Sequence, residues 1–225
     1  SKVKRNFSEI VFESHFFKKE TYRNLTNENI ISVDPEGTKD IDDAFHFEKK
    51  SHNHFKVAIH ISNVIDMLSY LRLPFLLDTG LISSIYTPDK VYPMFDIILS
   101  ENYLSLRQGK KRLAVTLWLE ILDKKIISSS FEKTIIQNKK QMTYKQYENL
   151  IKIDNQTKEF NEIIKNLKYK SLVYDDWDSH KFIEKLMCIY NCEASDKLSN
   201  KKQVYRIQED NNYLSENMDC ELKNF

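Results

Sequence analysis

The spacing of apolar residues changes along the chain from that of strands to that of helices, and this change constrains the fold most strongly. From Leu113 to Ile121 every second residue is aliphatic, and residues 55–61 alternate in the same way. From about Tyr144 the apolar side chains recur at helical spacing, and residues 179–199 carry the stripe of one long helix. The sequence therefore predicts an α+β domain, with a mixed or antiparallel sheet and packed helices.

The remaining elements are expected around these segments. The sequence predicts strands at residues 30–33, 44–48 and 126–136, and helices at residues 64–71 and 76–86. The polar residues 1–29, with scattered aromatics, are interpreted as a lead-in segment, and residues 211–225 as a polar tail.

Glycine and proline are rare and confined to one part of the chain. The 225 residues include three Gly and four Pro, and all seven lie between Pro35 and Gly109. A usual glycine share is about 7%, so the deficit is large. Unusual backbone geometry is therefore concentrated in this stretch, which is where we expect a functional site.

Charge and cysteine content narrow the class of protein. With 34 Lys+Arg against 33 Asp+Glu, the chain is not a purely basic nucleic-acid coat, although a local basic groove stays open. No apolar run approaches the roughly 18–20 residues of a membrane span, and we expect no membrane association. The odd set Cys188, Cys192 and Cys220 makes no disulfide framework, so we expect a reducing, cytoplasmic location. Cys188 and Cys192 are interpreted as small buried hydrophobes, because no second Cys/His pair suggests a metal.

The sharpest local feature is a group of four aspartates around a Pro-x-Gly turn between two expected strands. They are Asp34, Asp40, Asp42 and Asp43. Crowded carboxylates repel one another unless they are solvated or a cation neutralises them. Hard oxygen ligands suit Mg²⁺ or Mn²⁺, whereas the spacing does not fit a calcium loop. A solvated acidic turn is the alternative interpretation.

The residues around this turn resemble the signature of a known family. The run DPEGTKDIDDA at residues 34–44, followed by VAIHISNV at residues 57–64, is similar to that of the ribonuclease II (RNB) family of 3′→5′ exoribonucleases. This family includes ribonuclease R and the hydrolytic subunit of the eukaryotic exosome. Further similar runs follow in the family's order: SIYTP at 84–88, YPM at 92–94, MTY at 142–144, DSH at 178–180, IEKLM at 183–187 and YRI at 205–207.

The resemblance covers about residues 22–210, and we interpret residues 30–210 as a partial RNB catalytic domain. The family's "SPIRRY" segment, whose arginine grips the scissile phosphate, is expected beyond residue 210 and does not follow there. We therefore expect a domain that is incomplete at its C-terminal end and is active only with the remainder of a longer or split ribonuclease.

The resemblance implies hydrolytic, Mg²⁺-dependent degradation of single-stranded RNA to nucleoside 5′-monophosphates, with Mn²⁺ as a substitute. It assigns roles to seven residues: Asp34, Asp40 and Asp43 to the metal, Asp42 with Asp40 to catalysis, and Tyr86, Tyr144 and Glu184 to substrate binding. Stacking of bases on aromatic rings tolerates any sequence, as such an enzyme requires.

Two positions depart from the family pattern, and one alternative function stays open. Asn63 stands where the family usually has an aspartate, and Lys185 replaces the second acid of an "EE" pair. His60 is interpreted as a structural, hydrogen-bonding histidine. The alternative function is a truncated, non-catalytic relative that binds RNA or a protein partner and keeps the aspartates as a relic.

Overall fold

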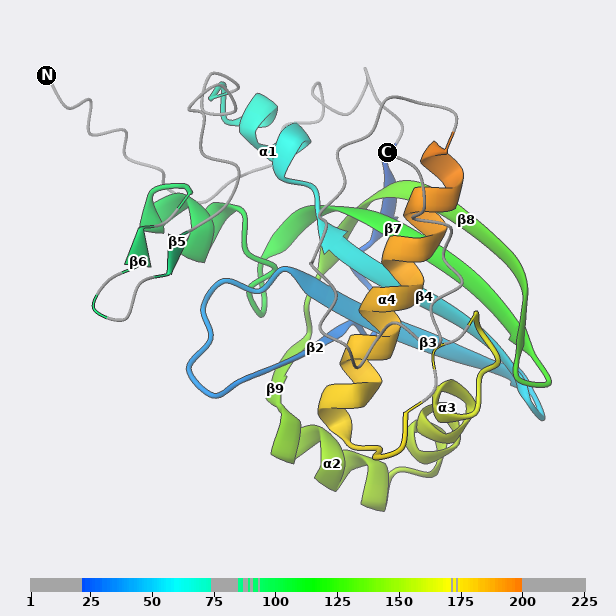
Figure 1. The fold of residues 1–225 in the computed structure, drawn as a ribbon. Coiled ribbons are helices and arrows are strands. Elements are labelled where there is room, and N and C mark those ends of the chain that lie inside the picture. Colours follow the sequence, from blue (N-terminus) through cyan, green and yellow to red (C-terminus); the bar gives the residue numbers. More distant parts are fainter. Residues whose placement is uncertain are drawn as a thin grey trace, which may run out of the picture.

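A seven-stranded mixed sheet forms the centre of the protein in a computed structural model, which describes residues 22–73, 85–86, 89, 91–92, 94–170, 172 and 174–199 (Figure 1). Its strands are β1 (Arg23–Leu25), β2 (Ile31–Asp34), β3 (Asp43–Ser51), β4 (His54–Ser62), β7 (Lys111–Leu122), β8 (Lys125–Gln137) and β9 (Lys140–Thr143). The spatial order is β1-β8-β7-β4-β3-β2-β9, in which β1–β8 and β2–β9 are parallel and the other neighbours are antiparallel. The predicted α+β class with a mixed sheet is confirmed.

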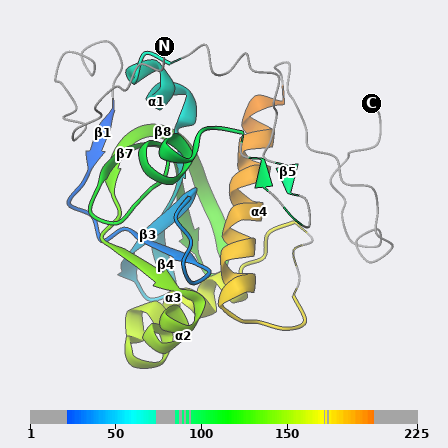
Figure 2. The same ribbon diagram turned by 90° about the vertical axis from the view of Figure 1, so that its left-hand side faces the viewer.

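One face of the sheet is covered by three helices, α2 (Tyr144–Ile153), α3 (Asn155–Lys165) and α4 (Ser179–Leu198) (Figures 1 and 2). The alternating aliphatic residues of β4 and β7 point to this face, where Val57, Ile59 and Leu117 are fully buried. From α4, Phe182 and Leu186 pack against them and are fully buried as well. Burial of such side chains stabilises the fold by about 1.5–3 kcal/mol each.

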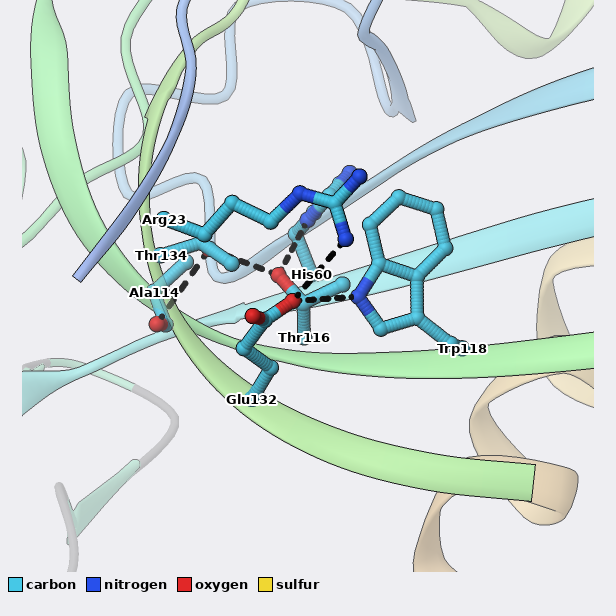
Figure 3. A network of polar contacts seen from close by, with 7 residues as sticks. All are labelled: Arg23, His60, Ala114, Thr116, Trp118, Glu132 and Thr134. Carbon is cyan, nitrogen blue, oxygen red and sulfur yellow. Dashed lines mark hydrogen bonds and ion pairs between the residues drawn. The ribbon is translucent and has the colours of Figure 1, made fainter. Parts of the chain in front are cut away.

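The opposite face of the sheet carries a buried polar row (Figure 3). His46, His60, Thr116 and Thr134 come from four neighbouring strands and are all buried. The hydroxyl of Thr134 donates to the Ala114 carbonyl at 3.4 Å, so it accepts from Thr116 at 2.6 Å. Thr116 then accepts from His60 Nδ1 at 2.7 Å, and His60 Nε2 accepts from His46 Nδ1 at 2.9 Å. This row confirms the structural interpretation of His60.

Most predicted elements are confirmed, with small shifts at their ends. Besides the strands, these are the helices α1 (Val64–Tyr70) and α4. The turn between β7 and β8 places Asp123 and Lys124 at φ 48° and 63°, the left-handed conformation of a tight hairpin. A π-helical segment, Leu99–Tyr103, was not predicted.

Two predictions need correction, and some lie outside the described residues. Part of the expected lead-in segment forms β1, whose Leu25 is buried against the sheet. The helix expected at 76–86 is wrong at its end, because Ile85–Tyr86 is strand β5, paired with β6 (Val91–Tyr92). Residues 76–84, the run YRI at 205–207 and Cys220 lie outside the described part.

None of the described helices combines the length and apolarity that crossing a membrane requires. Cys188 and Cys192 are half-buried rather than fully buried.

Candidate active site

The aspartates lie at one edge of the sheet, on the connection between β2 and β3. Asp34 is the last residue of β2 and Asp43 is the first of β3, and these strands are antiparallel neighbours. The chain turns back through Gly37, whose φ of 83° is a conformation that favours glycine. The two strand ends therefore bring acids from both sides of the turn to the same edge.

The loop between these strands is fixed by contacts from distant segments. The Ser105 hydroxyl donates to the Lys39 carbonyl at 2.7 Å and accepts from the Ile41 amide at 2.9 Å. Gln141 donates from its side chain to the Thr38 carbonyl at 2.8 Å. Ile41 itself is fully buried, which anchors the loop between Asp40 and Asp42. The loop therefore has a defined conformation and is more than a solvated acidic turn.

Burial and mutual repulsion make this group of carboxylates electrostatically unfavourable. Burial raises the pKa of Asp34 to about 6, with further increases from Asp42 and Asp40, against a hydrogen bond from Ser32. Burial, together with Asp34 and Asp42, raises the pKa of Asp43 to about 7. The pKa of Asp42 is raised by desolvation and by Asp40, although its side chain reaches solvent. A bound cation would relieve this repulsion.

The donor set fits a hard divalent cation. Asp34 has a buried carboxylate oxygen, Oδ2, with no hydrogen-bond partner, which is costly unless something pairs with it. Within the described part of the chain, no three His, Cys, Asp or Glu side chains form a ready metal cluster. Mg²⁺ commonly takes only one or two carboxylates, with waters and substrate phosphate completing its shell. Carboxylate oxygens such as that of Asp34 are therefore suitable ligands for Mg²⁺ or Mn²⁺.

Tyr144 is brought to the aspartates by the pairing of β2 with β9. In this parallel pair Asp34 lies opposite Thr143, so that Tyr144 begins α2 directly beside the acids. Thr143 caps the helix, and its side chain and that of Gln146 form a reciprocal capping box. The pKa of Tyr144 is raised by burial, then by Asp34, Asp43 and Asp178. The structure thus joins Tyr144 to the aspartate site.

The N-terminus of α4 approaches the same place. The imidazole of His180 stacks on the Tyr144 ring, with centroids 3.6 Å apart and planes at 21°. Asp178 caps α4 and lies 3.6 Å from His180 Nδ1. Ser179 donates to Glu148 at 3.0 Å, which ties α4 to α2. The sequence pattern contained His180, but nothing in it indicated contact with Tyr144.

The structure says less about the two other predicted substrate-binding residues, Glu184 and Tyr86. Glu184 lies one turn after His180 on α4, on the same helix face, and its carboxylate pairs with Lys181 at 2.8 Å. Tyr86 ends strand β5, but its side chain lies outside the described part. The structure therefore gathers Asp34, Asp42, Asp43 and Tyr144, and it does not test Tyr86.

Both departures from the family pattern have structural roles. Asn63 caps α1, accepting from the Asp66 amide at 3.2 Å and donating to the Asp66 carboxylate at 2.6 Å. Lys185 is buried, and its ammonium donates to two main-chain carbonyls at the end of α3. Neither residue belongs to the aspartate site.

Comparison with known sequences connects this arrangement to ribonucleases. The RNB domain profile matches residues 22–218. Ribonuclease R 2 of Lactococcus lactis is 35% identical over 149 residues, which cover 64% of this chain and 22% of that protein. Ribonuclease R of Mycoplasmopsis pulmonis is 32% identical over 176 residues, covering 70% and 24%. The chain thus spans about a quarter or less of these relatives.

Solved structures share the fold at low sequence identity. RNase R of Mycoplasma genitalium, in complex with ribose-methylated single-stranded RNA, has a TM-score of 0.65 at 22% identity, covering 84% of this chain and 35% of that one. Yeast Ssd1, described as a pseudonuclease, has a TM-score of 0.61 at 16% identity, covering 81% and 26%. Since the profile match extends over most of the sequence, the chain belongs to the RNB domain family, among the relatives of ribonuclease R.

Proposed function

We propose that this chain carries the metal-binding part of a hydrolytic 3′→5′ exoribonuclease that acts on single-stranded RNA and releases nucleoside 5′-monophosphates. The observation that supports it most is the site itself, in an RNB-family chain: Asp34, Asp42 and Asp43 share one edge of the sheet, and Asp34 has an unpaired buried oxygen. The named relatives are ribonucleases, and one related structure holds single-stranded RNA.

In this proposal the aspartates hold Mg²⁺ or Mn²⁺. Asp34, Asp40 and Asp43 act as ligands or orient water around the ion, and Asp42, with Asp40, contributes to cleavage. When bound, the divalent ion supplies positive charge at the scissile phosphate and makes water a better nucleophile. The loop contacts of Ser105 and Gln141 keep the acids in place for this task.

Tyr144 binds the end of the RNA. Its ring is half-buried beside the acids, so a nucleobase stacked on it places the neighbouring phosphate near the ion. Stacking of a base on an aromatic side chain contributes about 1–3 kcal/mol and is tolerant of sequence. Glu184, on α4, and Tyr86 are proposed to hold the terminal nucleotides with it.

The chain covers a small part of its relatives, so we propose that it acts together with further polypeptide in the natural protein. The test uses the longest natural polypeptide containing this sequence, with a 5′-labelled single-stranded RNA and Mg²⁺. We expect progressive shortening from the 3′ end, release of nucleoside 5′-monophosphates, and loss of both in EDTA.

Asp42→Asn provides the decisive variant, and Glu36→Gln, an exposed acid in the same loop, is its matched control. We expect Asp42→Asn to slow degradation by at least about 100-fold and Glu36→Gln to leave the rate unchanged. Equal rates for wild type and Asp42→Asn would overturn the proposal.

A second candidate function is RNA or protein binding without cleavage. It is favoured by the fold shared with yeast Ssd1, described as a pseudonuclease. Under this alternative the protein binds RNA or a protein partner, releases no nucleotides with Mg²⁺ or Mn²⁺, and is unaffected by Asp42→Asn.

A further inference from the structure

We propose that His180 is a positioning residue, which holds the Tyr144 ring for stacking with the terminal nucleobase of the RNA. This inference rests on the proposed function and assigns a role to a side chain outside the aspartate cluster. It is based on the direct ring contact between the two residues and on the contacts that fix each of them.

The contact between the rings is close and nearly parallel. The centroids of Tyr144 and His180 lie 3.6 Å apart at an interplanar angle of 21°, closer than the usual 4.5–7 Å for aromatic pairs. The imidazole therefore covers one face of the phenol ring. A nucleobase that stacks on Tyr144 has only the opposite face available, so His180 determines the side from which RNA approaches.

His180 is itself held from its own helix. Asp178 accepts from the Lys181 amide at 2.9 Å as the cap of α4, and its other carboxylate oxygen lies 3.6 Å from His180 Nδ1. The hydrogen bond from Ser179 to Glu148 joins the first turn of α4 to α2, the helix that begins at Tyr144. These contacts fix the distance between the two rings.

Solvent exposure indicates a role beyond packing. The His180 side chain is 60% exposed and that of Asp178 is 53% exposed, so this ring pair adds little to the hydrophobic core. The stack of His180 on Tyr144, next to Asp34 and Asp43, instead holds the Tyr144 ring in one orientation before RNA binds. Such preparation lowers the ordering cost when RNA binds.

The decisive experiment measures kcat and KM for degradation of a short single-stranded RNA, and its Kd in EDTA, where no cleavage occurs. We expect His180→Ala to raise Kd and KM by about 3- to 10-fold, since an aromatic pair contributes about that factor. The value of kcat should stay within about twofold, as expected when an interaction is equal in the ground and transition states. His180→Phe keeps a ring over Tyr144 and should restore most of the affinity.

A double-mutant cycle tests whether His180 acts through Tyr144. If it does, His180→Ala in the Tyr144→Ala background causes no further loss. Losses that multiply overturn the inference, and so does a His180→Ala protein with wild-type KM and Kd. His52→Ala, at an exposed histidine in the β3–β4 hairpin, is the matched control and should bind as wild type does.

The two proposals fail in different ways. A wild-type protein that neither binds nor degrades RNA overturns the proposed function, and the role of His180 with it. A wild-type protein that degrades RNA, with His180→Ala indistinguishable from it, overturns the role of His180 alone. Thermal unfolding of each variant, expected within about 2 °C of wild type at this exposed site, excludes misfolding as the cause.

Discussion

The buried ammonium of Lys185 lies 3.0 Å from the carbonyl oxygen of Leu167, and a second carbonyl, that of Lys165, is equally close. Lys165 is the last residue of α3 and Leu167 follows it by two residues, at the helix end where main-chain acceptors lack helical partners. Lys185, on α4, thus supplies hydrogen-bond donors to the carbonyl groups at the end of α3. Burial lowers the pKa of this ammonium group, and these carbonyls accept from two of its three N–H donors.

Lys185→Glu should therefore unfold the domain or destabilise it by about 3–5 kcal/mol, because a buried carboxylate would face two carbonyl oxygens. Lys185→Met, which keeps the volume but removes the donor, should cost about 1–3 kcal/mol. Urea denaturation measures both, with Lys181→Ala, at a partly exposed lysine of the same helix, as control. A Lys185→Glu protein as stable as Lys181→Ala would contradict this role.

Asn63→Asp restores the acid expected from the family pattern, and we expect it to weaken this protein. Asparagine and aspartate cap helices about equally well, but the new carboxylate would replace a donor that now lies 2.6 Å from the Asp66 carboxylate. The expected loss is about 1–2 kcal/mol of unfolding free energy. Asn63→Ser keeps the cap without a charge, so finding it less stable than Asn63→Asp would show that repulsion is absent.

The contribution of His46 to the stability of the domain should fall as the pH drops below about 6.5. Burial, with smaller effects from Lys56 and Arg23, lowers the pKa of His46 to about 4. In the unfolded chain His46 is therefore protonated below about pH 6.5, whereas in the folded chain it is protonated only below about pH 4. Because the unfolded state binds the extra proton between these values, acid favours unfolding. The stability contributed by His46 is fully present above its unfolded pKa of about 6.5. It decreases as the pH falls towards the folded pKa of about 4.

We expect a loss of about 1–2 kcal/mol from this group between pH 7 and pH 5, measured by urea unfolding at each pH. His46→Gln keeps a donor towards His60 and removes the titrating group, so the unfolding free energy of wild type relative to this variant should fall by that amount between pH 7 and pH 5. His52→Gln, at an exposed histidine, should follow wild type. Parallel curves for wild type and His46→Gln would contradict the prediction.

Tyr147→Phe should stabilise the domain. The ring of Tyr147 packs edge-on against Phe45 with centroids 5.8 Å apart, and its buried hydroxyl has no hydrogen-bond partner. Removing that hydroxyl relieves a desolvation cost, with an expected gain of about 1 kcal/mol. Tyr190→Phe is the matched comparison, because the Tyr190 hydroxyl donates to the Val115 carbonyl at 3.2 Å. Thermal unfolding should show opposite signs for the two variants, and the same sign would contradict the argument.

The spacing of apolar residues was sufficient to predict the long strands β4 and β7 and the long helix α4. Each of them buries apolar side chains at the regular spacing of its own secondary structure. This spacing did not predict β9, whose only buried residue is Met142 and which is held by pairing with the distant β2. For the same reason the sequence alone shows the aspartates, whereas the position of Tyr144 beside them depends on the pairing of β2 with β9. Asn63 and Lys185 depart from the family pattern in the sequence, but only their contacts in the folded protein explain these residues.

The parallel pairing of β2 with β9 also has a consequence during synthesis. Asp34 emerges from the ribosome early, but the strand that places Tyr144 beside it follows the whole β7–β8 hairpin. Such non-local pairings close late in folding. A nascent chain that ends at β8 therefore has the acidic residues without their aromatic neighbour, and the complete arrangement arises only in the finished sheet.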